Sequence, residues 1–327
     1  MRRLMCVPAA LAVSIICASC APRRNTKIAQ SMPALCNEDV LGSTCVTIDS
    51  TKDGDALDCI RTAHPNAPVH GSTRDAIANL SECTNTDATK ALPVVVVGHG
   101  MIGTVITGGG RFPANDDVFM SSAPLNLPHW EKLVMDELSS TATPRVGMVS
   151  LLSCDTAAEK GGLEFLVKLS TDLQRPVRGR TGLAFCDGTF EKNTCWLVVD
   201  PKATTPKPVH LPNRPKPAGS HPFTGGIVVP PGASISLSVR SDLDSKSSWI
   251  RIEDPASTKG LLELIDSTPG EHRIPLAVQT GEMKLDIGRT TLNLIVLNDR
   301  LIQVKDTHNY FYTYDGYGLL FSTLAQR

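Results

Sequence analysis

The amino-acid sequence predicts an α/β fold, with a mostly parallel sheet flanked by helices, followed by a β-rich C-terminal part. Two mostly apolar runs, at 92–97 with four consecutive valines after Pro93 and at 146–152, have the length and composition of strands buried on both faces. Apolar residues at helical spacing follow them, at about 129–139 and from about Thr156 to before Pro176. This alternation of strands with helices favours parallel pairing.

The length of 327 residues suits two domains better than one. Seven prolines and almost no large apolar residue fall within 201–224, so this stretch cannot form a core and is expected to be an extended linker. The expected organisation is a signal peptide at 1–20, a cysteine-bearing segment at 21–90, the α/β domain at 91–200, the linker at 201–224 and the β-rich domain at 225–327.

Shorter segments complete the expected elements. In the first domain these are a glycine-punctuated hairpin at 103–110 and strands at 177–185 and 196–199. In the last domain, alternating segments separated by turns are typical of a β-sandwich, with one helical turn near 261–265. Its expected strands are 227–229, 234–239, 249–252, 274–278, 290–297, 301–304, 310–314 and 319–321.

Composition narrows the class of protein. An apolar fraction of 41% and a charged fraction of 20% are those of a globular chain rather than a disordered or polytopic membrane protein. The formal net charge of −1 offers no basic excess to neutralise phosphates, so nucleic acid is not expected as a partner.

The first residues have the layout of a secretory signal. Arg2 and Arg3 precede an apolar stretch at 4–16, which is too short to span a bilayer, and small residues follow it. The sequence CASC at 17–20 resembles a bacterial lipoprotein box, although Cys17 stands where that pattern has an aliphatic residue. Export is therefore expected, to the periplasm or as an outer-membrane lipoprotein attached through Cys20, with ordinary cleavage nearby as the alternative to lipidation.

Seven cysteines remain when those of the signal and Cys20 are set aside, and an odd number in an exported chain leaves one thiol unpaired. Cys186 and Cys195 flank a short polar loop and predict a hairpin disulfide. Cys154 is then the free cysteine. Four others can form two bridges of undetermined pairing: Cys36, Cys45, Cys59 and Cys83.

Each of the two apolar runs is followed by a reactive side chain, His99 after the first and Cys154 after the second. The carboxyl ends of parallel strands meet at one sheet edge, where ligands bind. An imidazole can activate a thiol and then protonate the leaving amine, and a helix starting near Thr156 would lower the thiol pKa. The backbone amides of Gly100 and Cys154 are candidates to hold an oxyanion.

The run VVVVGHG at 94–100 is followed, 55 positions after its histidine, by a cysteine in the run VSLLSC at 149–154. This pattern resembles the His-Gly and Cys signature of caspase-like (clan CD) cysteine peptidases, and more narrowly CHAT domains and the autoprocessing cysteine protease domains of bacterial toxins. The resemblance covers about 91–200. It implies a caspase-like fold and a cysteine endopeptidase that cleaves a protein or peptide through a thioester on Cys154, with His99 as base and then acid.

The sequence does not decide which residues would select the substrate. Arg178 and Arg180 lie on the strand where the resemblance places the specificity pocket, and they would attract an acidic side chain or an anionic regulator unless they form a solvated edge. Asp155 and Asp187 would instead favour a basic residue, and Asp155 has the alternative role of capping the helix.

Two other functions remain as alternatives. One is a catalytically inactive caspase-like scaffold that binds proteins or surfaces, and the other is a sugar- or wall-binding lipoprotein that acts through its C-terminal domain. No metal site and no cofactor are expected. The histidines show no His-x-x-x-His spacing, and the cysteines outside the signal region show no Cys-x-x-Cys spacing. A serine hydrolase is disfavoured because the chain has no Gly-x-Ser-x-Gly motif.

Overall fold

The computed structural model describes residues 36, 45–49, 59–60, 62–63, 65, 69–70, 92–106, 119–121, 146–241, 247–268, 270 and 272–326. The predicted signal peptide with Cys20, the helix expected at 129–139, the residue Cys83 and the side chain of Cys45 lie outside the described residues.

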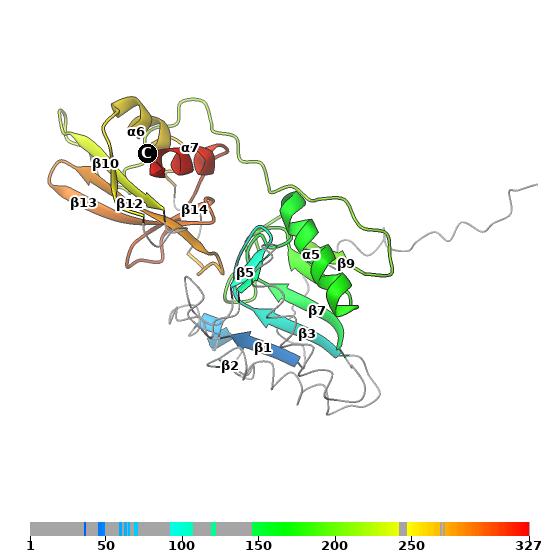
Figure 1. Cartoon of the computed structure of the whole chain (residues 1–327). Helices are drawn as coiled ribbons and strands as arrows, with labels where there is room; N and C mark the ends of the chain where they lie inside the picture. Colours follow the sequence, from blue (N-terminus) through cyan, green and yellow to red (C-terminus); the bar gives the residue numbers. More distant parts are fainter. Residues whose placement is uncertain are drawn as a thin grey trace, which may run out of the picture.

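The first sheet has the expected α/β character. Its six strands run in the order β2-β1-β3-β7-β8-β9, and all neighbours are parallel except the pair β8 and β9 (Figure 1). The strands expected at 92–97 and 146–152 are confirmed and are direct neighbours. The bounds are β1 Cys45–Asp49, β2 Val69–His70, β3 Leu92–Val97, β7 Val146–Leu152, β8 Val177–Arg180 and β9 Trp196–Val199.

Helix α5 (Glu159–Leu173) connects β7 to the parallel strand β8 and packs on the sheet. Leu163, Leu166 and Leu169 recur at helical spacing and share a buried cluster with apolar residues of β3, β7 and β8. The helix ends at Gln174, whose left-handed backbone (φ 52°) is followed closely by Pro176. The helix was expected to begin near Thr156, and it begins three residues later, at Glu159.

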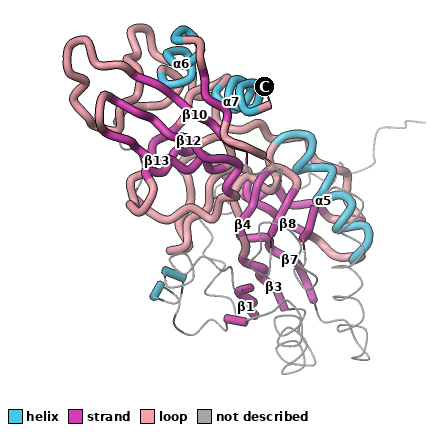
Figure 2. The backbone as a smooth tube through the Cα atoms, turned by 60° about the vertical axis from the view of Figure 1, so that its left-hand side comes forward, coloured by secondary structure: helices cyan, strands magenta, loops and turns pink. Residues whose placement is uncertain are grey.

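A small three-stranded sheet carries the loop after β3. Strand β4 (His99–Met101) turns at Gly103, which has a φ of 67°, into β5 (Thr104–Ile106), and β5 pairs with β6 (Phe119–Ser121). The hairpin expected at 103–110 is thus built from 99–106, and residues 107–110 lie outside the described part. Figure 2 shows β4 where the first sheet and the C-terminal part of the chain meet.

The C-terminal part contains one antiparallel sheet rather than the expected sandwich. Its strand order is β11-β10-β12-β13-β14-β15, and two helices pack against it (Figure 1). The bounds are β10 Ile235–Ser241, β11 Ile250–Ile252, α6 Pro255–Leu262, β12 Gln279–Ile287, β13 Thr290–Leu297, β14 Leu301–Val304, β15 Tyr310–Tyr312 and α7 Tyr317–Ala325.

Three expectations for this part were wrong. The residues at 319–321 belong to α7, because Tyr317, Phe321 and Leu324 bury one helical face in the core. The segments at 227–229 and 274–278 belong to no named strand. The longest strand, β12, was not predicted, although polar residues alternate along it with the buried Met283 and Leu285, which is the pattern of a half-buried strand.

The disulfides correct the predicted hairpin bridge. Cys36 bonds to Cys195 and Cys59 bonds to Cys186, so Cys186 and Cys195 are not paired with each other. Two bridges were expected among the four N-terminal cysteines, but Cys36 and Cys59 each bond to a cysteine outside that group. The loop between Cys186 and Cys195 is thereby fastened to the N-terminal segment at two points. These bridges indicate an oxidising, extracytoplasmic setting.

The proline-rich stretch has no helix and no named strand, as expected for an extended chain, but it is docked along its length. The Glu159 amide donates to the Val209 carbonyl (2.8 Å), and the Glu159 carboxylate accepts from the Leu211 amide (2.8 Å). Further on, Arg214 pairs with Glu191 (3.0 Å). The stretch therefore contacts the start of α5 and the loop between β8 and β9 before it reaches the second sheet.

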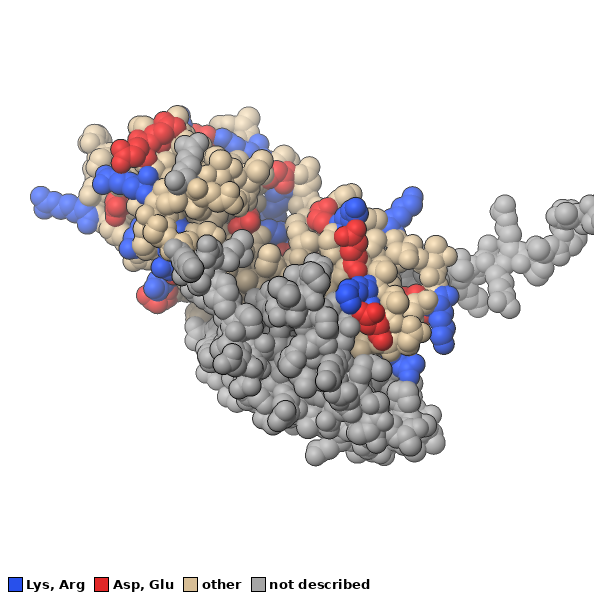
Figure 3. Space-filling model, viewed as in Figure 1, with Lys and Arg blue, Asp and Glu red and all other residues tan. Residues whose placement is uncertain are grey.

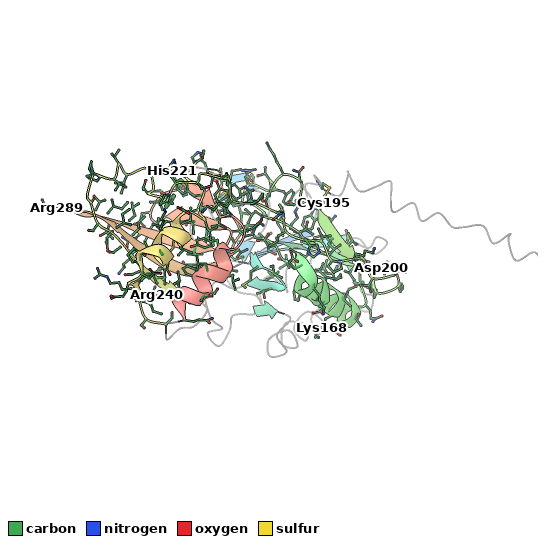
Figure 4. All side chains as sticks on the ribbon, turned by 90° about the horizontal axis from the view of Figure 1, so that it is seen from above. Lys168, Cys195, Asp200, His221, Arg240 and Arg289 are labelled. Atoms are coloured by element: carbon green, nitrogen blue, oxygen red, sulfur yellow. A yellow bond between two sulfur atoms is a disulfide. The ribbon has the colours of Figure 1, made fainter. Side chains whose placement is uncertain are left out.

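The surface carries charges of both signs. On the face shown in Figure 3, lysine and arginine side chains are interspersed with aspartate and glutamate, and along α5 Lys160 pairs with Glu164 and Lys168 with Asp172. Figure 4 labels residues at the two ends of the molecule: Arg240 and Arg289 lie in the C-terminal part, and Lys168 of α5 lies at the other end with Cys195 and Asp200, which flank β9. Within the described part of the chain, no helix is long and apolar enough to cross a membrane.

Candidate active site

The two residues predicted to act together lie at one edge of the first sheet. Val97 ends β3 directly opposite Leu152, which ends β7, and the Gly98 amide donates to the Leu152 carbonyl (3.2 Å). His99 and Cys154 each follow two residues after these paired positions. The parallel register thus places the imidazole and the thiol at the carboxyl ends of adjacent strands, as the sequence predicted.

The turn after Cys154 is held from three sides. The Asp155 amide donates to the Gly182 carbonyl (3.0 Å), and the Ala157 amide donates to the Arg180 carbonyl (2.9 Å). The Thr156 hydroxyl donates to the carbonyl of Cys154 itself (3.3 Å). Asp155 has a left-handed backbone (φ 55°), which aspartate tolerates better than most residues. These bonds fix the direction in which the Cys154 amide and thiol point.

Cys154 is a free cysteine, as expected from the odd count, and it is fully buried. Its thiol donates to the Ala184 carbonyl (3.2 Å) and accepts from the Ala184 amide (3.3 Å). Burial raises the pKa of the Cys154 thiol well above its ordinary value, and the charge of Asp155 raises it further. The thiol is therefore neutral in this arrangement, and it bonds to Ala184 rather than to His99.

The helix expected to lower the thiol pKa begins farther from Cys154 than predicted, and the pKa of the thiol is raised. Helix α5 begins at Glu159, and the amide of Glu159 donates to Val209 of the proline-rich stretch. Its N-cap, Ala158, has no side-chain capping bond, so Asp155 does not cap it. The prediction of a thiol activated by the helix N-terminus was therefore wrong for this state of the site.

His99 is half-buried, and its Nδ1 lies 3.0 Å from the carbonyl oxygen of Ala277. A carbonyl oxygen only accepts, so Nδ1 carries the proton in this bond. In a neutral ring Nε2 is then the basic nitrogen. The bond also shows that a segment of the C-terminal part reaches the imidazole.

The two amides predicted to hold an oxyanion converge on one atom. The Gly100 amide donates to the Leu276 carbonyl oxygen at 2.9 Å, and the Cys154 amide donates to the same oxygen at 3.2 Å. Two backbone donors aimed at one carbonyl oxygen, beside a thiol, form the geometry of an oxyanion hole. Both donors were predicted from the sequence. The sequence did not indicate that a carbonyl oxygen of the same chain accepts both hydrogen bonds.

Residues 274–278 lie extended between the two walls of the site. On one side, the Cys186 amide donates to the Ile274 carbonyl (3.0 Å) and the Leu276 amide donates to the Ala184 carbonyl (2.8 Å), which is an antiparallel pairing centred on Phe185 and Pro275. On the other side Gly100 forms a parallel bridge with Ala277. The segment expected as a strand at 274–278 thus pairs with Gly100 and with residues 184–186, and not with the C-terminal sheet.

Asp155, a candidate for substrate selection, instead binds the C-terminal part. It is buried and forms an ion pair with Arg300, and it accepts from the Asn298 side chain (3.1 Å). Burial raises the pKa of Asp155, against the opposing effect of Arg300 and Asn298. Arg300 also donates to Glu191 (2.9 Å), so one guanidinium joins two buried carboxylates.

Arg178 and Arg180 are buried, so they do not form a solvated edge. Arg178 donates to the Ser150 hydroxyl (2.7 Å) and lies over the ring of Trp196. Arg180 donates to the Thr194 carbonyl (3.0 Å) and lies over the ring of Phe190, and burial lowers its pKa to about 10. Both guanidinium groups are thus engaged in the packing beside β9.

Asp187, the remaining selection candidate, stabilises a turn. Its carboxylate accepts from the Thr189 amide (2.9 Å), and the Thr189 hydroxyl in turn accepts from Arg273 (2.6 Å). Arg273 lies over the ring of Phe185. The loop after the disulfide-bonded Cys186 therefore also contacts the extended segment at its N-terminal end.

Sequence reasoning missed Leu276, Asn298, Arg300 and Glu191. The apolar run at 274–278 and the Asn298-Asp299 turn were visible in the sequence, but nothing in their spacing links them to positions nearly 200 residues earlier. Among the described residues, no group of three or more His, Cys, Asp or Glu side chains could hold a metal ion.

A separate hollow of about 300 Å³ lies on the C-terminal sheet and is lined by Trp249, Glu282, Lys284 and Lys305 among others. The Trp249 ring lies beneath the Lys284 ammonium group. The hollow contains neither a cysteine nor a histidine, so it offers no nucleophile with a partner base. We therefore place the candidate chemistry at His99 and Cys154.

Comparison with known proteins adds no assignment, because no family model, no curated protein and no solved structure matches this chain.

Proposed function

We propose that the chain is a cysteine endopeptidase of the caspase-like type that hydrolyses peptide bonds with Cys154 as nucleophile and His99 as base and then acid. The observation that supports this most directly is the convergence of the Gly100 and Cys154 amides on a single peptide carbonyl oxygen. This carbonyl is that of Leu276, and the carbonyl oxygen of the next residue, Ala277, accepts a hydrogen bond from His99. The site thus already binds a peptide group through the amides of Gly100 and Cys154, and the His99 ring bonds to the next carbonyl oxygen.

In the proposed reaction, His99 takes the thiol proton and the Cys154 sulfur attacks the substrate carbonyl carbon. The negative charge that forms on the carbonyl oxygen is stabilised by the amides of Gly100 and Cys154. The carbon–nitrogen bond then breaks as His99 gives its proton to the leaving amine, and a thioester remains on Cys154. Water, deprotonated by His99, hydrolyses the thioester and restores the thiol.

We place this activity in the cell envelope of a bacterium, either in the periplasm or at the outer membrane through a lipidated Cys20. The two disulfides support an oxidising compartment. The substrate would be a protein or peptide, and the proposed reaction uses only side chains and backbone amides of this chain, together with water.

One observation favours a catalytically inactive binding protein of the same fold. The Cys154 thiol is buried, neutral and bonded to Ala184 at both its donor and its acceptor side. A thiol that remained in this state would not attack a carbonyl group. The peptidase proposal therefore requires that the segment at 274–278 leaves, because its departure would expose the sulfur to water and lower its pKa.

The test uses the mature chain and a broad library of internally quenched peptides, in the wild type and in Leu276→Ala, which weakens the covering segment. We expect turnover that is lost in Cys154→Ala and in His99→Ala. The double variant should be no less active than either single variant, because the two residues act as one unit. His221→Ala removes an exposed histidine of the proline-rich stretch and serves as the control that should retain activity.

The result is read together with a thioester trap. Brief incubation with a cleaved peptide and acid quenching should leave an acyl group on Cys154, visible by intact mass. If neither turnover nor an acylated Cys154 appears in wild type or Leu276→Ala, the inactive binding protein replaces the enzyme as the explanation of the site.

A further inference from the structure

The wall of the site and the segment that fills it have the arrangement of a bound peptide. Four backbone hydrogen bonds fix the register. The Cys186 amide donates to the Ile274 carbonyl, the Leu276 amide donates to the Ala184 carbonyl, and the amides of Gly100 and Cys154 both donate to the Leu276 carbonyl. This adds an extended strand to residues 184–186, which is how extended peptides commonly bind to an exposed strand. The peptide group held at the two amides is the one between Leu276 and Ala277.

We infer, on the basis of the proposed peptidase function, that the groove between Gly100 and 184–186 accepts an extended peptide with a large aliphatic side chain before the cleaved bond. We further infer that 274–278 occupies this groove as a substrate-like strand in the intact chain. The assignment goes beyond the activity itself because it names the substrate class and the segment that keeps the site closed.

The preference for an aliphatic residue follows from the surroundings of Leu276. Its side chain is buried in an apolar cluster that also contains Leu152, Cys154, Ala184 and Phe185. A charged side chain in this position would lose its hydration without gaining an ion pair, which is costly. Arg180 and Asp155 do not change this, because they bind Thr194 and Arg300.

The segment is bound in a state that does not favour its own cleavage. The Cys154 thiol donates its proton to the Ala184 carbonyl, and the His99 Nδ1 proton is directed at the Ala277 carbonyl oxygen. The thiol is therefore not ionised beside the Leu276 carbonyl carbon. Leu276 and Ala277 are both buried, so the segment also covers the sulfur from water.

The segment is fastened by residues of the turn between β13 and β14. The Asn298 side chain donates to the Gly100 carbonyl (2.7 Å) and accepts from the Val278 amide (2.8 Å). Arg300 adds its ion pair with Asp155. Opening the groove thus requires the start of β12 and this turn to move away together, so a partner that pulls on the C-terminal sheet would admit substrate.

The experiment measures how fast iodoacetamide alkylates Cys154 in the folded, full-length mature chain, mapped by mass spectrometry. We expect slow alkylation in the wild type. Leu276→Ala should increase the rate at least about tenfold, because removal of a buried leucine side chain weakens the docked segment. Leu285→Ala is the matched control, since it removes the same atoms from a buried position on β12 that lies in a different cluster.

A second measurement adds a synthetic peptide with the sequence of residues 273–278 to Leu276→Ala. The peptide should enter the vacated groove and slow alkylation of Cys154. A peptide with D-leucine at the position of Leu276 should not, because its side chain cannot reach the same pocket. If Leu276→Ala is unfolded by circular dichroism, Ala277→Gly replaces it, because glycine loosens an extended backbone without removing a large side chain.

The outcomes separate this inference from the peptidase proposal. Faster alkylation in Leu276→Ala alone, with protection by the L-peptide, supports the inference even if no peptide is cleaved, and in that case the peptidase proposal fails. Equal rates in Leu276→Ala and Leu285→Ala, or no protection beyond that of the D-leucine peptide, overturn the inference whether or not peptides are cleaved. A purified wild-type chain cut after Leu276 also overturns it, because the segment would then be consumed rather than retained.

Discussion

Arg300 of the C-terminal part forms a buried ion pair with Asp155, the residue that follows the candidate nucleophile in the chain. The same guanidinium donates to both carboxylate oxygens of Glu191 at 2.9 Å. Burial disfavours the charged guanidinium, but Asp155 and Glu191 more than offset this and raise its pKa. One arginine therefore ties the turn after Cys154 to the sheet that supplies the covering segment.

Removal of this arginine charge should destabilise the fold strongly. Arg300→Gln would leave Asp155 and Glu191 buried without their main counter-charge, and breaking a buried pair in this way typically costs about 3–5 kcal/mol. We expect that loss in the free energy of unfolding by urea. Arg289→Gln, at an exposed turn of the same sheet (Figure 4), should change it by less than about 0.5 kcal/mol. Equal stability of the two variants would show that Arg300 is not needed to balance the buried carboxylates.

The two central strands of the first sheet, β3 and β7, were predictable because their sequences are mostly apolar. The run of valines at 94–97 and the run at 146–152 are typical of strands covered on both faces, and α5 follows from leucines at helical spacing. Local chemistry also marked His99, Gly100 and Cys154, because each sits directly after such a run. These features depend on neighbours in the chain, which the sequence shows.

The remaining features depend on contacts between distant segments. The disulfide of Cys59 with Cys186 joins positions 127 residues apart, and the bond of Asn298 to Gly100 joins positions 198 residues apart. The hairpin spacing of Cys186 and Cys195 suggested a local bridge that the fold does not use. The apolar segment at 274–278 has the pattern of a strand and is extended, but its pairing partner lies in the other part of the molecule.

Gly100 is expected to tolerate no side chain. A Cβ atom at this position would lie 2.5 Å from the Ser153 Cβ and 2.7 Å from the Cys154 carbonyl oxygen. Gly100→Ala should therefore displace the Gly100 amide from the Leu276 carbonyl and cost about 1–3 kcal/mol in the free energy of unfolding. If the proposed chemistry holds, it should also lower kcat by about 100-fold or more, as loss of an oxyanion donor does.

Gly161→Ala is the control for this substitution. Gly161 lies in the first turn of α5, where an added Cβ would meet only the Ile102 side chain at 3.5 Å. Alanine is the better helix former by about 1 kcal/mol, so Gly161→Ala should leave the protein as stable as the wild type or more so. Equal effects of the two substitutions in urea unfolding would argue against the close packing around Gly100.

The buried Cys154 thiol should make stability depend on alkaline pH. Its folded pKa is raised by burial and by Asp155, above the ordinary value of about 8.5 that it has in the unfolded chain. Between these two values the unfolded chain has lost the thiol proton and the folded chain retains it. The free energy of unfolding should therefore decrease as the pH rises above about 8.5, by at most about 1.4 kcal/mol per pH unit from this group.

Urea unfolding of the wild type and of Cys154→Ala at pH 7 and pH 9.5 isolates this contribution, since the other titrating groups are shared. The stability advantage of the wild type should shrink at the higher pH. An identical pH dependence in the two proteins would mean that the thiol is no more buried in the folded chain than in the unfolded one.

Limited trypsin digestion should cut first at Lys202, at the start of the proline-rich stretch. The side chains of 202–205 are exposed, whereas the stretch from Val209 to Arg214 is bonded to Glu159, Glu191 and Asp315. In addition, trypsin cuts poorly before proline, which follows Lys207, Arg214 and Lys216. For the mature chain that begins at residue 21, we expect two fragments of about 180 and 125 residues on a denaturing gel.

The two fragments should nevertheless elute as one species in size-exclusion chromatography. The disulfides from Cys36 to Cys195 and from Cys59 to Cys186 both lie before the cut, so they do not join the fragments. The fragments are held by the backbone bonds of Leu276, by the ion pair of Arg300 with Asp155, and by an apolar cluster to which both contribute buried side chains. Arg300→Gln should shift the cut protein toward separate peaks, because it removes the buried charge pair but leaves the cleavage site unchanged. Separation of the wild-type fragments without denaturant would show that the covering segment is bound too weakly to keep the site closed.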